Sequence, residues 1–183
     1  KVSTKKKPMK QLIKSKGINF GIAYGLFLIL LTLYAYAIDL NFFASFWFLG
    51  LVMVGFFVNG LWVIGSLKKI QEGFVTFKEG FTVFFISNAL ALLLSTIITM
   101  LIFLVVDPEL QVTVKELTIA KTTVMMENFG APTDAIEEAI DKLRTQDNFS
   151  LVAQIKGYFS TLAISSIMGL LFALILKRKK EEE

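Results

Sequence analysis

Four long apolar runs constrain this chain more than any other feature. They cover approximately residues 18–38, 42–65, 81–106 and 155–176, and each has at least 21 residues. An α-helix rises about 1.5 Å per residue, so each run can cross a hydrocarbon core about 30 Å thick. Lys156, the second residue of the last run, is the one charged side chain within them. The sequence therefore predicts an all-α polytopic membrane protein built as a four-transmembrane-helix bundle.

Basic residues are distributed unevenly among the remaining segments. Fourteen of the nineteen lysines and arginines lie in residues 1–17, 66–80 and 177–183. Four spans that alternate in direction put these three segments on one side of the membrane, and the positive-inside bias makes that side cytoplasmic. We therefore expect five parts along the chain: a basic cytoplasmic segment (1–17), helices 1–3 (18–106), an extracytoplasmic hairpin (107–154), helix 4 (155–176) and a cytoplasmic tail (177–183).

The N-terminal segment 1–17 contains seven lysines and no acidic residue. We expect it not to pack but to lie on the membrane surface, where lysines are attracted to anionic lipid. A plain topology signal is the favoured interpretation of this charge. A nucleic-acid partner is not expected.

Residues 107–154 form the one sizeable segment outside the predicted spans. Asp107-Pro108 is typical of a helix start, and Gly130-Ala131-Pro132 is typical of a helix end. The segment is therefore predicted to form two short amphipathic helices in a hairpin, with apolar stripes that meet each other, the membrane or a partner chain. The stripe residues that are candidates for partner binding are Leu110, Val114, Leu117, Ile136, Ile140 and Leu143.

Small residues recur at every fourth position in the first and last spans. Such ridges let helix backbones approach closely in lipid, where the hydrophobic effect does not drive helices together. The ridges could meet within one subunit or contact another subunit, so Gly169→Leu is expected to weaken assembly. The predicted helix-packing residues are Gly17, Gly21, Gly25, Gly157, Thr161, Ser165, Gly169 and Ala173.

Polar side chains within the spans have two interpretations. Asn59, Asn88, Ser95 and Thr99 could line a path for water or a small solute, or they could hydrogen bond between helices. We favour hydrogen bonding. A transport pathway normally includes an ionisable residue or a helix break, and no acidic residue or proline lies within these spans.

Catalytic, cofactor-binding and metal-binding residues are not predicted. The chain contains no cysteine and no histidine, and it lacks the G-x-x-x-x-G-K-[ST] phosphate loop. Intramembrane proteases need paired aspartates, a serine with a base, or a metal-binding His/Glu set, and none of these occurs in the spans. We therefore expect a protein that is not an enzyme and needs no cofactor.

Short motifs resemble an uncharacterised bacterial membrane family, domain of unknown function 4199. They are Gly73, Phe74, Thr76 and Phe77 before the third span, Asp107-Pro108 after it, and the lysine-rich tail 177–180. The resemblance covers about residues 17–180. It implies four spans and the inner membrane of a Gram-negative bacterium, and it brings no catalytic or ligand residues.

These features together predict a non-catalytic accessory or scaffolding subunit that packs against other membrane proteins. The alternative is a small oligomeric pore or transporter for a neutral solute, which would use the polar face of the third span.

Overall fold

The computed structural model describes residues 8–178. Four helices are long and apolar enough to cross a membrane, which confirms the predicted all-α membrane bundle. The elements in chain order are α1 (Met9–Ala37), η1 (Leu40–Phe42), α2 (Phe46–Ile70), α3 (Phe77–Met100), η2 (Leu101–Val106), α4 (Leu110–Asn128), α5 (Thr133–Thr145) and α6 (Leu151–Leu176).

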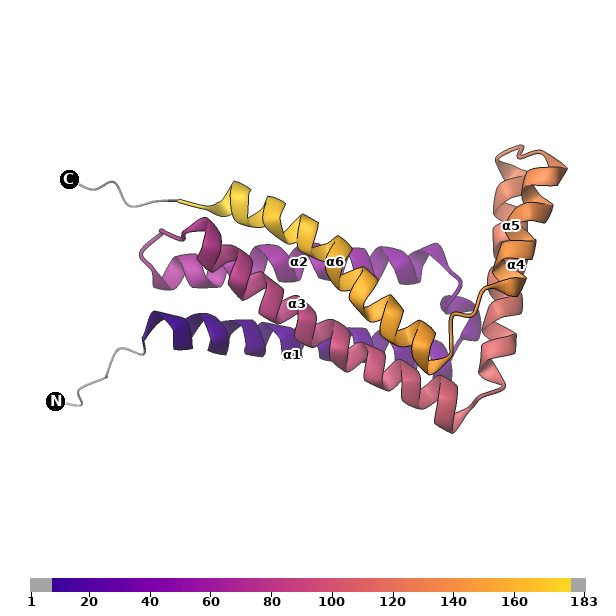
Figure 1. The fold of residues 1–183 in the computed structure, drawn as a ribbon, viewed down its shortest axis with the longest axis horizontal. Helices are drawn as coiled ribbons and strands as arrows, with labels where there is room; N and C mark the ends of the chain where they lie inside the picture. The colour runs from indigo at the N-terminus through magenta and orange to yellow at the C-terminus, as the bar shows by residue number, and fades with distance from the viewer. Residues whose placement is uncertain (1–7, 179–183) are drawn as a thin grey trace.

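The four long helices α1, α2, α3 and α6 lie side by side (Figure 1). Both ends of the described chain lie at one end of this bundle, which we call the termini end. The α4–α5 hairpin lies across the opposite end, the hairpin end, with its axis roughly perpendicular to the bundle. The hairpin thus runs along the plane that a membrane surface would occupy.

Helix α1 begins at Met9, well before the predicted span at residue 18. Lys10 and Lys14 are exposed, while Ile13 and Gly17 on the same stretch of helix are buried. The expectation that residues 1–17 do not pack is therefore wrong for residues 9–17. Residues 1–7 and 179–183, with the lysines there, lie outside the described part of the chain.

The other long helices also begin at positions defined by polar caps. Ser45 and Ser150 cap α2 and α6 by accepting hydrogen bonds from the N–H groups of Phe48 and Ala153. Thr76 and Glu79 form a reciprocal capping box at α3. The predicted 66–80 connection is consequently only the six residues 71–76, since α2 continues to Ile70 and α3 starts at Phe77.

A short backbone bridge closes the termini end. Val75 and Arg178 form an isolated antiparallel bridge with N···O distances of 3.0 and 2.9 Å. The Arg178 guanidinium lies 5.8 Å from the centre of the Phe74 ring. Lys68 donates a hydrogen bond to the Leu176 carbonyl, so the α2–α3 turn and the end of α6 are held together.

Helix α3 is the centre of the bundle and contacts each of the other three spans. Phe56 of α2, Phe84 of α3 and Phe172 of α6 contact one another pairwise, with ring centroids 5.7–5.8 Å apart. Glycines provide the space for these rings. A Cβ atom at Gly60 would lie 2.7 Å from the Phe172 ring, and one at Gly169 would lie 2.3 Å from the Phe84 ring.

Helix α3 continues without a break into the π-helix η2. The wider π turn leaves backbone carbonyls in need of partners, and Gln111 of α4 donates a 2.6 Å hydrogen bond to the Phe103 carbonyl. The predicted helix start at Asp107 is present, since the Asp107 carboxylate accepts a hydrogen bond from the Leu110 N–H. These contacts fix the angle at which the hairpin leaves the bundle.

Substituting Gly21 with alanine tests the closeness of α1 and α3. The new Cβ would lie 2.7 Å from the Ser87 carbonyl oxygen, a backbone atom that cannot move aside cheaply. We expect Gly21→Ala to lower the free energy of unfolding by about 1–3 kcal/mol. Denaturant titration in mixed micelles would measure this loss.

Gly50→Ala is the matched control. A Cβ at Gly50, also in a helix, meets nothing within 4 Å. Its effect should be neutral or slightly stabilising, since alanine favours a helix over glycine. Equal effects of the two substitutions would contradict the importance of close packing at Gly21.

Candidate functional site

The glycine ridge of α1 contacts α3 along its whole length. Gly17, Gly21 and Gly25 are buried. Alanines at these positions would place Cβ atoms 2.8 Å from Ile86, 2.7 Å from the Ser87 carbonyl oxygen and 2.9 Å from Leu94, respectively. This ridge is therefore used within the subunit.

The small-residue ridge of α6 divides into two halves. Ser165, Gly169 and Ala173 are buried, and Gly169 receives the Phe84 ring of α3. Gly157 and Thr161 are exposed, and a Cβ at Gly157 would meet nothing within 4 Å. The two predicted ridges thus both use α3 as their partner inside the subunit. In the half of α6 nearest the hairpin, Tyr158 donates a hydrogen bond to the Ala89 carbonyl of α3, but the ridge itself is exposed, and in this sense that half of α6 is free.

A cleft of about 480 Å³ lies beside this free half of α6. Leu92 and Thr96 of α3 form one wall, and Gly157 and Thr161 form part of the other. Lys156 and Asp147 also line it, so the cleft is polar at the hairpin end. Hydrogen bonds from the side chain and the backbone of Ser150 hold the pKa of Asp147 below its usual value, which favours the charged carboxylate.

The intramembrane polar residues are paired between helices at the centre of the bundle. Ser87 of α3 donates to the Asn59 side-chain oxygen at 3.0 Å. The Asn88 amide donates to Ser165 of α6 at 2.6 Å, and Ser165 donates in turn to the Leu162 carbonyl. Ser95 and Thr99 are half-buried farther along α3. Asn59 and Asn88 therefore join α2, α3 and α6 instead of lining one continuous polar face.

The amides of this cluster are only partly satisfied. The Asn59 side-chain nitrogen and the Asn88 side-chain oxygen are buried and have no hydrogen-bond partner in the described residues. A buried polar atom without a partner costs free energy. The cluster therefore specifies which helices pair more than it stabilises the bundle.

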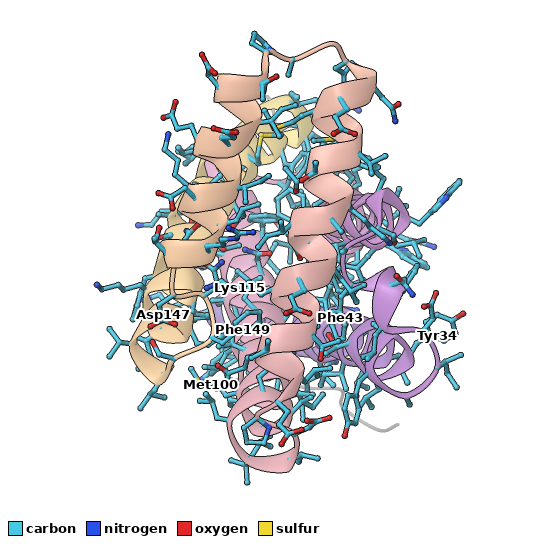
Figure 2. The ribbon with its side chains drawn as sticks, turned by 90° about the vertical axis from the view of Figure 1, so that its right-hand side faces the viewer. Tyr34, Phe43, Met100, Lys115, Asp147 and Phe149 are labelled. Carbon is cyan, nitrogen blue, oxygen red and sulfur yellow. The ribbon has the colours of Figure 1, made fainter. Side chains whose placement is uncertain are left out.

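The hairpin is paired with itself and anchored to the bundle (Figure 2). Leu110 and Val114 are buried with Ile102 and Phe103 of η2, against Phe43 and Phe149. The Phe103 and Phe149 rings stack with centroids 4.8 Å apart. Lys115 of α4 donates a hydrogen bond to the Arg144 carbonyl of α5.

This anchoring changes the set of residues that can bind a partner. Leu110 and Val114, predicted as partner-binding candidates, are instead used to seat the hairpin on its own bundle. Leu117, Ile136, Ile140 and Leu143 are half-buried in the paired hairpin. Two amphipathic helices joined by a short turn can cover each other, as α4 and α5 do. Leu117 also lines a groove between α4 and the start of α2.

A cluster of side chains that could bind a metal ion is not found in the described residues. The chain has no histidine or cysteine, and residues 8–178 contain no group of three acidic side chains placed to hold a metal ion. The aromatic contact of Phe56, Phe84 and Phe172 was not predicted, because eighteen phenylalanines offer no signal for which three meet.

The Ser165 hydroxyl gives a clean test of the polar cluster. Ser165→Ala removes the acceptor for Asn88 without adding volume, so we expect a loss of about 0.6 to 1.7 kcal/mol in unfolding free energy. The neighbouring Ser166 bonds only its own helix, at the Leu162 carbonyl. Ser166→Ala should therefore be close to neutral in the same micelle titration, and a loss as large as that of Ser165→Ala would contradict the interhelical role.

Comparison with known proteins identifies a family and no individual relative. The family described as "Protein of unknown function (DUF4199)" matches residues 19–178. No curated protein and no solved structure shows detectable similarity to the chain. The match covers most of the chain, from the first apolar run to the bridge residue Arg178, and agrees with the resemblance carried by Gly73, Phe74 and Asp107-Pro108. This four-span membrane protein therefore belongs to the family of unknown function DUF4199.

Proposed function

We propose that this protein is a non-catalytic accessory or scaffolding subunit that binds another integral membrane protein. The observation that carries the proposal is the unpartnered half of the α6 ridge. Gly157 and Thr161 are exposed, while the other members of the same ridge are buried against α3. A lipid-facing surface gains nothing from small residues, but a second transmembrane helix packs closely on them.

The surroundings of Gly157 support a helix as the occupant. Ile155, Phe159 and Ile164 are exposed beside the ridge, so a partner helix would bury large apolar side chains around a small-residue contact. The adjacent cleft between α3 and α6 gives that partner a recess to enter. The van der Waals energy gained at such a contact holds membrane helices together.

The hairpin would supply the contact outside the membrane. The bundle covers Leu110 and Val114, and the apolar stripe of α5 is half-buried in the paired hairpin, so the polar surface of α5 remains available to a partner. Glu137, Glu138 and Asp141 are exposed there, so we propose a partner with basic residues at the hairpin end.

The polar cluster supports the accessory role over the alternative of a small oligomeric pore or transporter. Asn59 and Asn88 are buried and hydrogen bonded between helices, whereas a solute path needs polar groups that a solute can reach.

The proposal also includes a location and an orientation. We place the protein in the inner membrane of a bacterium, with both termini in the cytoplasm. The charge distribution supports this, since fourteen of nineteen basic residues lie in residues 1–17, 66–80 and 177–183, and the other five lie on the hairpin side.

Mild-detergent purification of a tagged chain from its own membranes tests the proposal. We expect stoichiometric recovery with a second membrane protein, and Gly157→Leu should weaken that association about tenfold or more, because the leucine side chain holds the partner helix away. Gly50→Leu, another exposed helical glycine with open space around it, is the matched control and should leave recovery unchanged.

A lone homo-oligomer that supports solute flux in liposomes would contradict the accessory role. Gly169→Leu was expected from the sequence to weaken assembly, but it is not a suitable test of assembly. Gly169 contacts Phe84 inside the subunit, so a side chain there would disturb the fold and could not report on assembly alone.

A further inference from the structure

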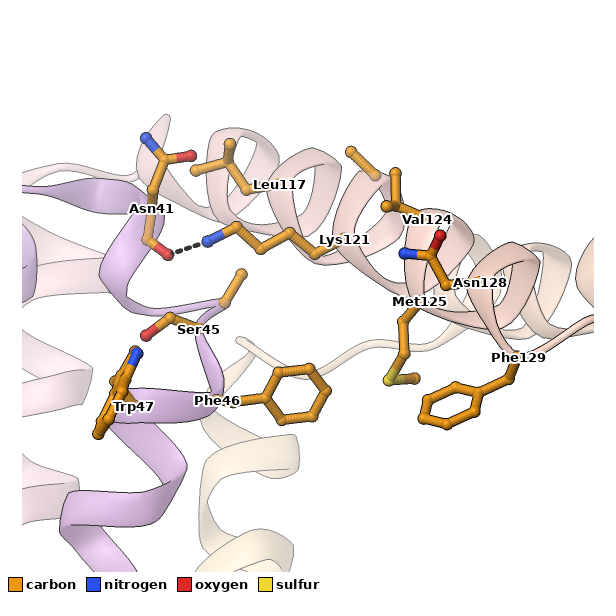
Figure 3. A pocket seen from close by; sticks show the side chains of 12 residues that line it. Asn41, Ser45, Phe46, Trp47, Leu117, Lys121, Val124, Met125, Asn128 and Phe129 are labelled. Carbon is orange, nitrogen blue, oxygen red and sulfur yellow. Dashed lines mark hydrogen bonds between the residues drawn. The ribbon is translucent and has the colours of Figure 1, made fainter.

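An apolar groove of about 690 Å³ lies between the underside of α4 and the start of α2 (Figure 3). Phe46 and Trp47 of α2 form one side, and Met125 of α4 and the adjoining Phe129 form the other. These are among the most exposed aromatic rings of the described chain, at 71% for Phe46, 79% for Trp47 and 85% for Phe129. The groove exists because α4 extends past the bundle and overhangs the end of α2 (Figure 1).

Lys121 is the one charged side chain among the residues that line this groove. Its ammonium group donates a hydrogen bond to the Asn41 carbonyl. An ammonium group has three donors, so two remain for a ligand. The groove also contains the first residues of α2, where the positive end of the helix dipole adds to the charge of Lys121. An apolar groove with a positive pole at one end suits an amphipathic anion.

The groove continues onto the lipid-facing surface of α2. Trp47, Leu51, Val54 and Val58 follow one another at helical spacing and are all exposed. The last three line a second apolar groove, of about 610 Å³, whose other wall is Tyr24 and Phe27 of α1. The helix rises about 16 Å from Trp47 to Val58, close to the half-thickness of a hydrocarbon core, about 15 Å.

We propose that the two grooves together bind one glycerophospholipid of the leaflet at the hairpin end. Its phosphate lies between Lys121 and the start of α2, and one acyl chain follows the exposed face of α2 into the crevice beside Tyr24 and Phe27. The aromatic rings of Phe46, Trp47 and Phe129 surround the glycerol region, the depth at which aromatic side chains concentrate in membrane proteins. This site is separate from the free half of α6 and does not depend on the accessory role.

Trp47 is a built-in reporter for the site, because the chain contains only two tryptophans. The Trp62→Phe variant leaves Trp47 alone. It would be reconstituted in vesicles of phosphate-free diglycosyldiacylglycerol with a fixed minor fraction of phosphatidylglycerol brominated on its acyl chains. The comparison uses the same fraction of brominated diglycosyl lipid. We expect the quenching of Trp47 to show a preference of about fivefold for the phospholipid.

Substitutions in α4 test whether Lys121 causes the preference for the phospholipid. Lys121→Met should reduce it to about one, and Lys121→Arg should retain it. Lys115→Met is the matched control, since Lys115 bonds α5 and lies outside the groove, and it should keep the full preference.

Equal quenching of Trp47 by the two brominated lipids would overturn the proposal. So would a preference that survives Lys121→Met, or no quenching by either lipid, which would mean that a protein segment covers the groove. If Lys121→Met fails to fold, full preference in Lys121→Arg together with its loss in Lys121→Gln still tests the charge.

Discussion

The close approach of α1 to α3 is the contact on which the rest of this structure depends. Lipid tails are as apolar as leucine, so helices associate within a bilayer only where they pack better with one another than with lipid. Gly17, Gly21 and Gly25 allow close packing against α3 along about two turns of α1, where alanines would bring Cβ atoms closer than 3 Å to α3. Once α1 covers one side of α3, the opposite sides remain for α2 and α6.

The arrangement of α2, α3 and α6 is further specified by aromatic rings and a hydrogen bond that require one relative position of the helices. The rings of Phe56, Phe84 and Phe172 need the glycines at positions 60 and 169, and the Asn88–Ser165 hydrogen bond needs α6 in one rotation about its axis. These contacts are made in the half of α6 nearest the termini. In the other half the ridge residues Gly157 and Thr161 are exposed, and that difference within a single helix underlies the proposed protein contact.

The proposed protein and lipid sites use different helices at the same end of the bundle. The free half of α6 would receive a partner helix, and the face of α2 beneath the α4 overhang would receive a phospholipid. The hairpin connects them, because its base rests on Phe103 and Phe149 and its far end forms the roof of the groove. A lipid in the groove would thus support the hairpin from below while its outer surface remains available.

The spans, the hairpin and the family could be predicted from the sequence, because long apolar runs and signals such as Asp107-Pro108 and Gly130 act locally. It could not show that α1 starts at Met9, since burial of Ile13 depends on helices that are distant in sequence. The small-residue ridges were recognisable, but periodicity alone does not say which half of a ridge finds a partner. For the same reason Leu110 and Val114 were assigned to a partner, although the bundle itself covers them.

Thiol labelling of intact cells tests the central claim most directly, because the chain has no cysteine of its own. The claim is that four helices cross the membrane and that the hairpin and the termini lie on opposite sides. A membrane-impermeant maleimide added outside should label Glu137→Cys in α5 and should label Lys78→Cys, at the start of α3, only after the membrane is opened. Labelling of both positions from the same side would contradict the claim.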